Sequence, residues 1–311
     1  MNPSARTSLE QQHEVFTRRT AIAAGLTPDQ IRWALSSRRW TALRRGHYVT
    51  TEHLLVLAHD VRAMHTLQAR AALMHLGCAV VISHRSAAVL HGIVLHRPPA
   101  VVTVTTGRHE RRTVLGVDVR TTRSPDLQSE LIEGLPVTCA ARTVIDVART
   151  EPLADALVVM DAAVGSGLAT REELESLLDE HSRWPGITAA REALRRCDPA
   201  TGDPVRSWCR GHLIEQGLPA PECDVEVSAS GVPLGRYGFV WPERRTLAAI
   251  DPVVGSPQEQ LDEVRRRRRL DDRVRGLGYE VVSFAIDEIE EQPQLVAHRI
   301  RSAFGRAAHA A

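Results

Sequence analysis

The sequence predicts an α+β protein of several domains that begins with a winged helix. The chain has 311 residues, which is enough to bury two or three hydrophobic cores. Two short helical patterns and a hairpin pattern follow one another between Phe16 and Val49, and strand-like and helical segments then succeed one another to the C-terminus. From the shifts in composition we expect a winged-helix domain, an α+β middle domain, a helical connector and a last α/β domain, at residues 1–50, 51–150, 151–200 and 201–311.

Two short helices are predicted between residues 16 and 37. Gly25 is expected to cap the C-terminus of the first. Thr27 then stands at the N-cap position and Pro28 at the first helical position, and both residue types favour a helix start there. Helical spacing predicts that the second helix buries Ile31, Ala34 and Leu35.

A basic hairpin is predicted directly after these helices, in the stretch RRWTALRRGHYV. Its expected apolar anchors are Trp40, Leu43 and Tyr48, and its turn holds Arg44, Arg45 and Gly46. Helix, turn, helix and basic hairpin, in this order, are the layout of a winged helix.

The basic residues are concentrated in this N-terminal region. Residues 1–50 hold eight arginines against Glu10, Glu14 and Asp29, a local charge of +5 in a chain whose total is +1. Such an excess suits contact with phosphates and predicts double-stranded DNA as a partner, whereas a small helical hairpin with a solvated arginine face is the alternative. We expect the second helix in the major groove and the hairpin on the backbone or minor groove. The predicted DNA-contacting residues are Thr27, Gln30, Arg32, Trp33, Ser36, Arg38, Arg39, Arg44, Arg45 and His47.

The overall composition excludes several other classes of protein. All 39 basic residues are arginine, which we attribute to a GC-rich coding sequence. The five cysteines are widely spaced and odd in number, which argues against a disulfide framework or a zinc site and favours a reducing, cytoplasmic location. No apolar run predicts a signal peptide or a membrane span. With aromatic residues at only 4%, a stacking platform for single strands is not expected.

The middle region begins with helical periodicity from Glu52 to Leu76, as one long helix or two broken ones. A short extended run, Ala79 to Ile82, precedes a helix that Ser83 is expected to cap. His84 and His91 lie seven residues apart and so share one face of that helix, where they could bind a metal. We favour a structural role, because ligand pairs on one helix are usually three or four residues apart.

Alternating segments then predict strands, at Val101–Thr106, Gly116–Thr122 and Leu127–Ile132, with a charged turn at residues 107–112. Thr138 is the expected N-cap of the helix that follows, which carries Arg142, Thr143 and Asp146. Leu153–Asp198 is predicted to be a helical connector. The stretch DPATGDP, Asp198–Pro204, combines Pro, Gly and Asp, and there we expect the last domain boundary.

The last domain is predicted to contain a mixed sheet flanked by helices, because a meander precedes a crossover helix and a further strand. The expected order is helix, three strands, helix, strand and helix. The segments are Val205–Gln216, Asp224–Ser228, Gly235–Trp241, Leu247–Asp251, Pro257–Gly276, Glu280–Phe284 and Leu295–Phe304.

Several motifs resemble those of one family of multidomain proteins. In the last domain they are VRSWCRGHLIEQGLPAPE, GRYGFVWPERRTLAAIDP and RRRRRLDDRVRGLGYEVVSF, which are similar to very-short-patch-repair endonucleases of the PD-(D/E)XK superfamily. Upstream, RRWTALRRGHYV, VISHRSAAVLHGI and GLPVTCAARTVIDVA resemble the AbiEi-like antitoxin or transcriptional regulator of type IV toxin–antitoxin systems. The resemblance implies a restriction-endonuclease-like C-terminal domain and a nucleotidyltransferase-like toxin as a partner. A protein that acts only by binding such a partner is a third interpretation.

The carboxylates that the nuclease resemblance implies are missing at the matching positions. Arg206 replaces the acid of the first helix, Gly238 that of the second strand, and Ala249 (or Ile250, one residue later) the third. Asp251 alone remains. One carboxylate beside an arginine is a poor site for a hard cation, so we expect a nuclease-like fold without nuclease chemistry, and neither metal nor cofactor. The alternative is a metal-dependent endonuclease with displaced acids, for which the candidates are Glu226, Glu243 and Glu259.

The run Arg265–Arg269 lies within a predicted helix, so its five side chains are expected to point all round the axis. Either this is a solvated helix, partly neutralised by nearby acids, or it binds phosphates along a duplex and adds non-specific affinity. For the second interpretation the predicted phosphate contacts are Arg265, Arg266, Arg268 and Arg269.

Overall fold

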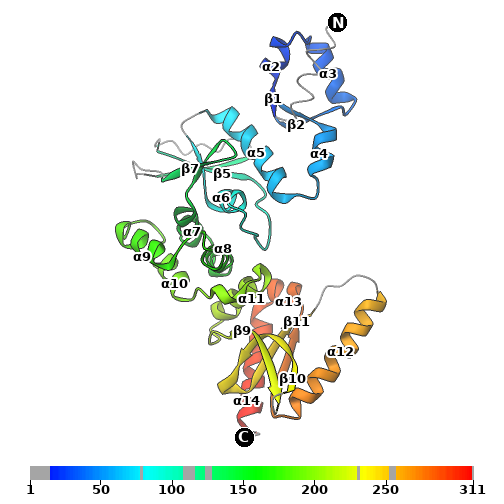
Figure 1. Ribbon diagram of the computed structural model, residues 1–311, viewed down its shortest axis with the longest axis vertical. Helices are drawn as coiled ribbons and strands as arrows, with labels where there is room; N and C mark the ends of the chain where they lie inside the picture. Colours follow the sequence, from blue (N-terminus) through cyan, green and yellow to red (C-terminus); the bar gives the residue numbers. More distant parts are fainter. Residues whose placement is uncertain are drawn as a thin grey trace. The chain divides into compact units, whose positions relative to one another are not determined.

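The computed structural model describes residues 15–77, 80–107, 116–122, 128–229, 232–251 and 257–309. The fold is α+β, as predicted, and the chain divides into two compact units, Met1–Asp146 and Val147–Ala311 (Figure 1). The boundary predicted at residues 198–204 falls inside the second unit, and the division into four domains stays a prediction. Among the described residues, no helix has the length and apolar character of a membrane span.

The first unit begins with a small three-stranded sheet and two helices. Their bounds are β1 Phe16–Thr17, α2 Arg18–Ala23, α3 Pro28–Ser36, β2 Trp40–Arg44 and β3 His47–Thr50. The strands run antiparallel in the order β1-β3-β2. Phe16 meets Trp40 edge-on at 4.6 Å between ring centroids, and Trp40 stacks on Tyr48 at 6.1 Å. Trp40 and Tyr48 are therefore core anchors, as predicted, whereas Leu43 is half-buried and packs on a separate cluster with Val49.

Local signals at α3 are confirmed. Thr27 and Gln30 form a capping box, in which the Thr27 side chain accepts a hydrogen bond from the Gln30 amide and the Gln30 side chain accepts one from the Thr27 amide. Ile31 and Ala34 are buried, and Leu35 only partly. Ala24 is the C-cap residue of α2, and Gly25 ends the helix at the next position, as predicted. Gly25 follows it with φ +88°, a conformation that suits glycine.

The rest of the first unit is built from helices around a five-stranded sheet. The bounds are α4 Thr51–Leu57, α5 Val61–Leu76, β4 Val81–Ile82, α6 His84–Leu90, β5 Val102–Thr106, β6 Val117–Thr121, β7 Ser129–Ile132, β8 Leu135–Thr138 and α7 Ala140–Ala148. The strand order is β6-β5-β4-β8-β7. One face of α5 packs against this sheet through Ala69 and Ala72, and another against the hairpin side through Leu67 and Ala71. Of the predicted extents, Ala79, the turn at 108–112 and Leu127 lie outside the described residues.

Two predicted helix caps in this unit have different outcomes, because Ser83 occupies the predicted N-cap position without the side-chain hydrogen bond and Thr138 does not adjoin its helix. Ser83 stands at the N-cap of α6, but its hydroxyl accepts a hydrogen bond from Thr105 (2.7 Å) and contacts His84 instead of a helix amide. Thr138 precedes α7 by two residues, and its hydroxyl lies 2.7 Å from that of Thr143. In both places a neighbouring buried side chain competes for the hydroxyl more effectively than the helix amides.

His84 at the start of α6 and His91, the C-cap residue after it, contact neighbouring protein groups. Nδ1 of His84 lies 2.9 Å from the Ser83 hydroxyl, and Nε2 of His91 donates to the Thr138 carbonyl at 2.8 Å. His91 thus ties the end of α6 to β8, in line with the favoured structural interpretation.

The second unit begins with helices and continues into a mixed sheet. The helices are α8 Leu153–Gly165, α9 Arg171–Glu180, α10 Ile187–Arg195, the 3-10 turn η1 Pro199–Thr201, and α11 Pro204–Glu215. The remaining bounds are β9 Glu222–Ala229, β10 Val232–Trp241, η2 Pro242–Arg244, β11 Thr246–Ile250, α12 Pro257–Arg275, β12 Glu280–Phe284, α13 Ile286–Glu291 and α14 Pro293–His309. The sheet order is β12-β11-β10-β9, with β11 and β12 parallel and the other pairs antiparallel, as a mixed sheet requires.

Candidate nucleic-acid interface

The outer face of α3 carries three of the predicted contact residues. The Arg32 side chain is 77% exposed and pairs with Asp29 one turn earlier on the same face. Trp33 is 53% exposed, and the Ser36 hydroxyl donates to the Trp33 carbonyl at 3.1 Å. An exposed ion pair of this kind contributes little to stability, so Arg32 can exchange Asp29 for a phosphate or a base edge at small cost.

Thr27 and Gln30 hold the start of α3. The Gln30 Oε1 accepts from the Thr27 amide at 2.8 Å, and the Thr27 hydroxyl accepts from the Gln30 amide at 3.3 Å. Both residues therefore fix the helix start. The side-chain nitrogen Nε2 of Gln30 is the group that is left to contact a base edge. The contact predicted for these two residues stays a prediction.

The turn after α3 presents two more arginines. Arg38 has φ +54°, a left-handed conformation that reverses the chain at the end of the helix, and its side chain is exposed. Arg39 is exposed as well, and its carbonyl accepts the Thr51 amide at 2.9 Å, which fixes the turn to the start of α4. Both exposed arginines therefore lie in the turn that follows α3.

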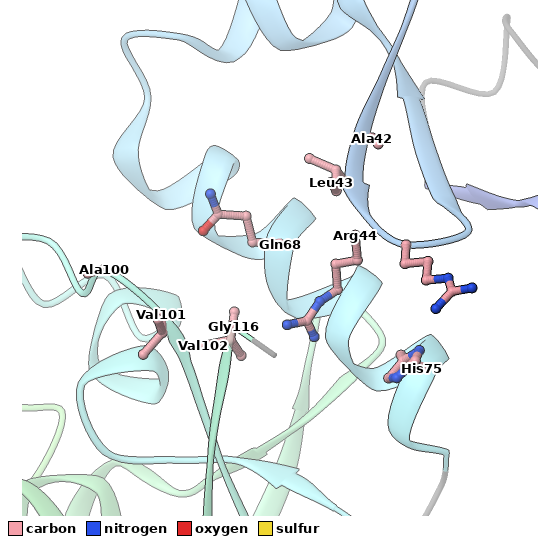
Figure 2. Close-up of a pocket in the computed structure, with 10 residues that line it drawn as sticks. Ala42, Leu43, Arg44, Gln68, His75, Ala100, Val101, Val102 and Gly116 are labelled. Atoms are coloured by element: carbon pink, nitrogen blue, oxygen red, sulfur yellow. The ribbon is translucent and has the colours of Figure 1, made fainter. Parts of the chain in front are cut away.

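The two arginines of the hairpin turn lie in different environments. Arg45 is exposed beside Gly46, which has φ +79°. Arg44 is half-buried, and its Nη2 lies 3.1 Å from where a Cβ atom on Gly116 would stand (Figure 2). Burial lowers the pKa of Arg44 below its ordinary value. The pairing of β2 with β3 shifts register between Ala42 and Arg44. Such an irregularity changes the direction in which the neighbouring side chains point.

His47 is also withdrawn from solvent. The residue is 7% exposed, its Nδ1 contacts the Arg45 carbonyl at 3.2 Å, and its ring meets that of His75 edge-on at 5.6 Å. The sequence placed His47 and Arg44 together with Arg45 on one basic turn. The structure separates them, because one face of the hairpin packs on α5.

Sequence reasoning missed Arg18 and Arg19 at the start of α2. Both are exposed, and the Arg18 amide donates to the Gly46 carbonyl at 2.8 Å, which joins this helix start to the hairpin turn. The sequence signal was the arginine pair directly after the N-cap residue Thr17. These residues extend the cationic surface around Arg45.

In the second unit, two of the three positions expected to have lost their acid lie together. A Cβ atom on Gly238 would stand 3.9 Å from Nε of Arg206. The Arg206 guanidinium lies 3.3 Å from the Asp224 carboxylate and donates to the Thr201 carbonyl at 3.1 Å. Ala249 is buried within β11. An arginine thus lies beside the position from which a carboxylate on Gly238 would project.

Asp251 follows β11 and is exposed, and its amide donates to the Phe284 carbonyl at 2.8 Å. Desolvation raises its pKa, and the nearby Glu288 carboxylate adds to that rise. Among the described residues, no three His, Cys, Asp or Glu side chains are grouped as metal ligands. Glu226 and Glu243 are exposed, and the Glu259 side chain lies outside the described part of α12.

The arginine run on α12 has one inward member. Arg267 lies over the Tyr237 ring, 4.3 Å from its centroid, with Nε 3.5 Å from the carboxylate of Asp271. That carboxylate also accepts the Tyr237 hydroxyl at 2.9 Å. The four arginines predicted to contact phosphates are exposed: Arg265, Arg266, Arg268 and Arg269.

Residues 75–196 match the family of the AbiEi antitoxin C-terminal domain. Two uncharacterized proteins of Mycobacterium tuberculosis, MT2308 of strain CDC 1551 / Oshkosh and Rv2248 of strain H37Rv, are each 30% identical to the chain over 224 residues, which is 71% of this chain and 80% of theirs. The chain belongs to the family of these two mycobacterial proteins, and its residues 75–196 match the AbiEi antitoxin C-terminal domain. The crystal structure of the RV2827C protein from Mycobacterium tuberculosis is similar at 17% identity and a TM-score of 0.42, over 71% of this chain and 82% of that one.

The AbiEi match runs from the end of α5 to the end of α10. It supports a role of the antitoxin or transcription-regulator type. The arginine surface of residues 15–50 and the mixed sheet of the second unit both lie outside the matched segment, so their functions are argued from their own chemistry.

Proposed function

We propose that this AbiEi-like protein is an antitoxin-type transcription regulator that binds duplex DNA through a winged helix formed by α2, α3 and the β2–β3 hairpin. The observation that carries the proposal is the exposed arginine surface of this region. Its members come from the start of α2, the outer face of α3, the turn after α3 and the hairpin turn: Arg18, Arg19, Arg32, Arg38, Arg39 and Arg45. Asp29 is the one acidic residue within residues 15–50.

In this proposal α3 lies in the major groove. Arg32 and Ser36 face base edges, with Trp33 beside them, because they occupy the exposed face of a helix whose N-terminus is fixed by its capping box. Arg38, Arg39 and Arg45 contact phosphates on either side of the groove and supply most of the affinity. The predicted contacts of Arg44 and His47 receive less support, since both side chains are turned toward the rest of the first unit.

We further propose that the mixed sheet of the second unit is a nuclease-like domain that binds DNA without cutting it. Support comes from Arg206, whose guanidinium occupies the space beside Gly238 where a nuclease would place acidic metal ligands. The exposed arginines of α12 offer phosphate contacts on this domain. A nucleotidyltransferase-like toxin remains the expected protein partner, and a gene for one beside this gene would support it.

Fluorescence anisotropy on the DNA upstream of the protein's own gene tests the winged-helix proposal. The full-length protein is titrated at several salt concentrations, alongside Arg45→Ala and Arg32→Ala. We expect the Arg45 change to weaken binding to all sequences and to lower the salt slope by about 0.9. We expect the Arg32 change to cost specificity as well, by about 1–3 kcal/mol for a lost base contact.

The matched control is Arg183→Ala, which removes an exposed arginine from the second unit. Equal weakening by the control and by Arg45→Ala, or wild-type binding that ignores salt, contradicts the winged-helix assignment. Incubation with supercoiled plasmid and Mg²⁺ or Mn²⁺ tests the second proposal. Cleavage that disappears in Asp251→Ala contradicts it and favours an endonuclease with displaced acids.

A further inference from the structure

Strand β7, Ser129–Ile132, lies at an edge of the five-stranded sheet of the first unit. Among the described residues, β8 is the strand that pairs with it, in an antiparallel register that runs from Ser129 opposite Thr138 to Ile132 opposite Leu135. The other side of an edge strand carries backbone amides and carbonyls to which a further strand can bind.

The turn after β7 fixes which of its backbone groups point outward. Glu133 and Gly134 form a two-residue turn with φ +51° and +75°, and a type I′ hairpin turn requires positive φ at both positions. In such a hairpin the pair beside the turn, Ile132 and Leu135, exchanges both hydrogen bonds. The next pair along the two strands exchanges none, so its backbone groups point away from the partner strand.

This alternation continues along β7. The Cys139 amide donates to the Gln128 carbonyl at 2.7 Å, so bonded pairs recur at every second position from the turn. Ser129 and Leu131 belong to the pairs between them, and their amides and carbonyls point away from β8. Pro136, opposite Leu131, has no amide with which to bond it. A further strand can therefore pair with Ser129 and Leu131 without disturbing β8.

The side chains of β7 offer an apolar contact at this edge. Leu131 keeps 75% of its surface exposed, although it is a large apolar residue. Its neighbour Ile132 points to the opposite face of the sheet and packs on the core of the unit. A strand paired with β7 would place a side chain directly beside Leu131 and remove apolar surface from water.

The charge of this edge selects the occupant. The Glu130 side chain is 53% exposed, and its carboxylate lies 4.0 Å from Nε2 of His91. Glu133 in the turn is 51% exposed and pairs with Arg62 at 3.1 Å. Residues 128–139 contain these two acids and no basic residue. A strand with cationic side chains on the face of Glu130 complements this charge, because opposite charges on neighbouring strands attract.

The same charge disfavours a second copy of this chain as the occupant. Two antiparallel β7 strands use all of their outward backbone groups when Ser129 of one copy lies opposite Leu131 of the other. That register places Glu130 directly opposite Glu130, and like charges in this position are destabilising. The charge therefore favours a segment of a different protein.

We propose that β7 binds an extended segment of a partner protein, in which basic and β-branched residues alternate, as an added antiparallel strand. The backbone of the segment bonds to Ser129 and Leu131. Its apolar side chains lie beside Leu131, and its basic side chains lie on the face of Glu130. The inference goes beyond the proposed function, because it concerns a protein segment and requires no DNA.

Isothermal titration calorimetry on the full-length protein tests this edge with three peptides that are blocked at both ends. The probe has the sequence KVKVKVK. One matched peptide, KVKPKVK, keeps the charge and removes a strand amide, and the other, EVEVEVE, reverses the charge. We expect the probe to bind with a dissociation constant of about 1 mM or tighter, and both matched peptides to bind at least about tenfold more weakly. Bound probe should also slow hydrogen exchange in the fragment that contains Ser129 and Leu131.

Three variants locate the binding. Leu131→Pro removes an outward amide and should abolish binding of the probe, and an edge strand tolerates proline where the amide faces solvent. Glu130→Gln should weaken binding by about two- to fivefold and Leu131→Ala by about three- to tenfold. The control is Glu52→Gln, which changes an exposed glutamate of α4 in the same unit and should bind like the wild type. Thermal unfolding shows whether each variant is folded.

Four results overturn the proposal. They are no binding of the probe by the wild type, equal binding of KVKVKVK and KVKPKVK, unchanged binding in folded Leu131→Pro, and a loss in Glu52→Gln as large as that in Glu130→Gln. If Leu131→Pro does not fold, unchanged binding in both Leu131→Ala and Glu130→Gln overturns it instead. None of these readouts involves DNA, so a failure of the winged-helix proposal leaves this test intact, and the reverse holds as well.

Discussion

Arginine serves opposite purposes in two regions of this molecule. In residues 15–50 the side chains of Arg18, Arg32, Arg38 and Arg45 are exposed. In α11 of the second unit, Arg210 is 2% exposed, and its Nη2 donates to the carboxylate of Asp161 on α8 at 2.7 Å. The exposed arginines can pair with a partner's phosphates at little cost in protein stability. Arg210 instead holds two helices of the same unit together.

The carboxylate of Asp161 explains why α8 and α11 pack so closely. It accepts hydrogen bonds from Arg210, from the Ser207 hydroxyl at 2.7 Å and from the Asp198 amide at 2.8 Å. A Cβ atom on Gly211 would stand 2.3 Å from Cα of Ala154, so only glycine allows this approach of the helices. Asp198 begins the stretch predicted as a linker, and in the structure that stretch is fixed to α8 within the second unit.

The sharpest test of the contrast removes one arginine of each kind. Arg210→Met leaves Asp161 buried without its cation and should lower the free energy of unfolding of the second unit by about 3–5 kcal/mol. Arg45→Met removes an exposed charge and should change it by no more than about 0.5 kcal/mol. Urea denaturation followed by circular dichroism measures both. Similar losses in the two variants would show that the contrast is wrong.

A second test concerns a buried histidine in the first unit. His65 on α5 is 4% exposed, and burial lowers its pKa from the ordinary 6.5 to about 4, against a smaller opposing effect of a hydrogen bond with Gln68. The unfolded chain therefore binds a proton between these pH values while the folded chain does not, so stability falls as the pH drops from 6.5 to 4. The loss is at most about 3 kcal/mol.

His65→Leu should remove this pH dependence without a large loss at pH 7. The measurement is the urea midpoint of the first unit between pH 7 and 4. A variant that keeps the wild-type slope would assign the dependence to other groups.

The exposed arginines should matter for binding in proportion to the phosphates they neutralise. Arg38→Ala and Arg45→Ala together should lower the slope of log K against log salt by about 1.8 and weaken duplex binding by roughly ten- to a hundredfold. Thermal unfolding should not change. Fluorescence anisotropy at four salt concentrations measures the slope. An equal change of the slope in Arg183→Ala would contradict the assignment of DNA binding to the N-terminal arginines.

The smallest expected effect belongs to the helix that carries this surface. Thr27→Ala removes one half of the capping box and should cost about 1 kcal/mol of stability. Ser37→Ala, which removes a hydroxyl with a weak 3.4 Å contact to the Ala34 carbonyl, is the control. Loss of DNA affinity in Thr27→Ala beyond its loss of stability would assign Thr27 a direct contact.

Sequence patterns located most helices and strands, because caps and alternation are local. Three elements lie where their residue types predicted them: the capping box of Thr27 and Gln30, the hairpin of β2 and β3, and the strand Glu280–Phe284. The patterns failed at Ser83 and Thr138, whose hydroxyls bond side chains distant along the chain or buried in the next helix. For Ser83 no local signal could show this, because the pairing of β4 with β5 brings Thr105 beside it, whereas Thr143 lies only five residues beyond Thr138.

The sequence by itself determined the composition of the candidate surfaces: the arginine excess before residue 50, the loss of acids at Arg206, Gly238 and Ala249, and the run Arg265–Arg269. Tertiary structure decided which of these side chains reach solvent. Arg44 turns toward Gly116 while Arg45 stays outside, and Arg267 packs on Tyr237 while its neighbours are exposed. Adjacent residues of one type differ in this way because the burial of a side chain depends on which parts of the fold pack beside it. The neighbouring sequence does not show which parts these are.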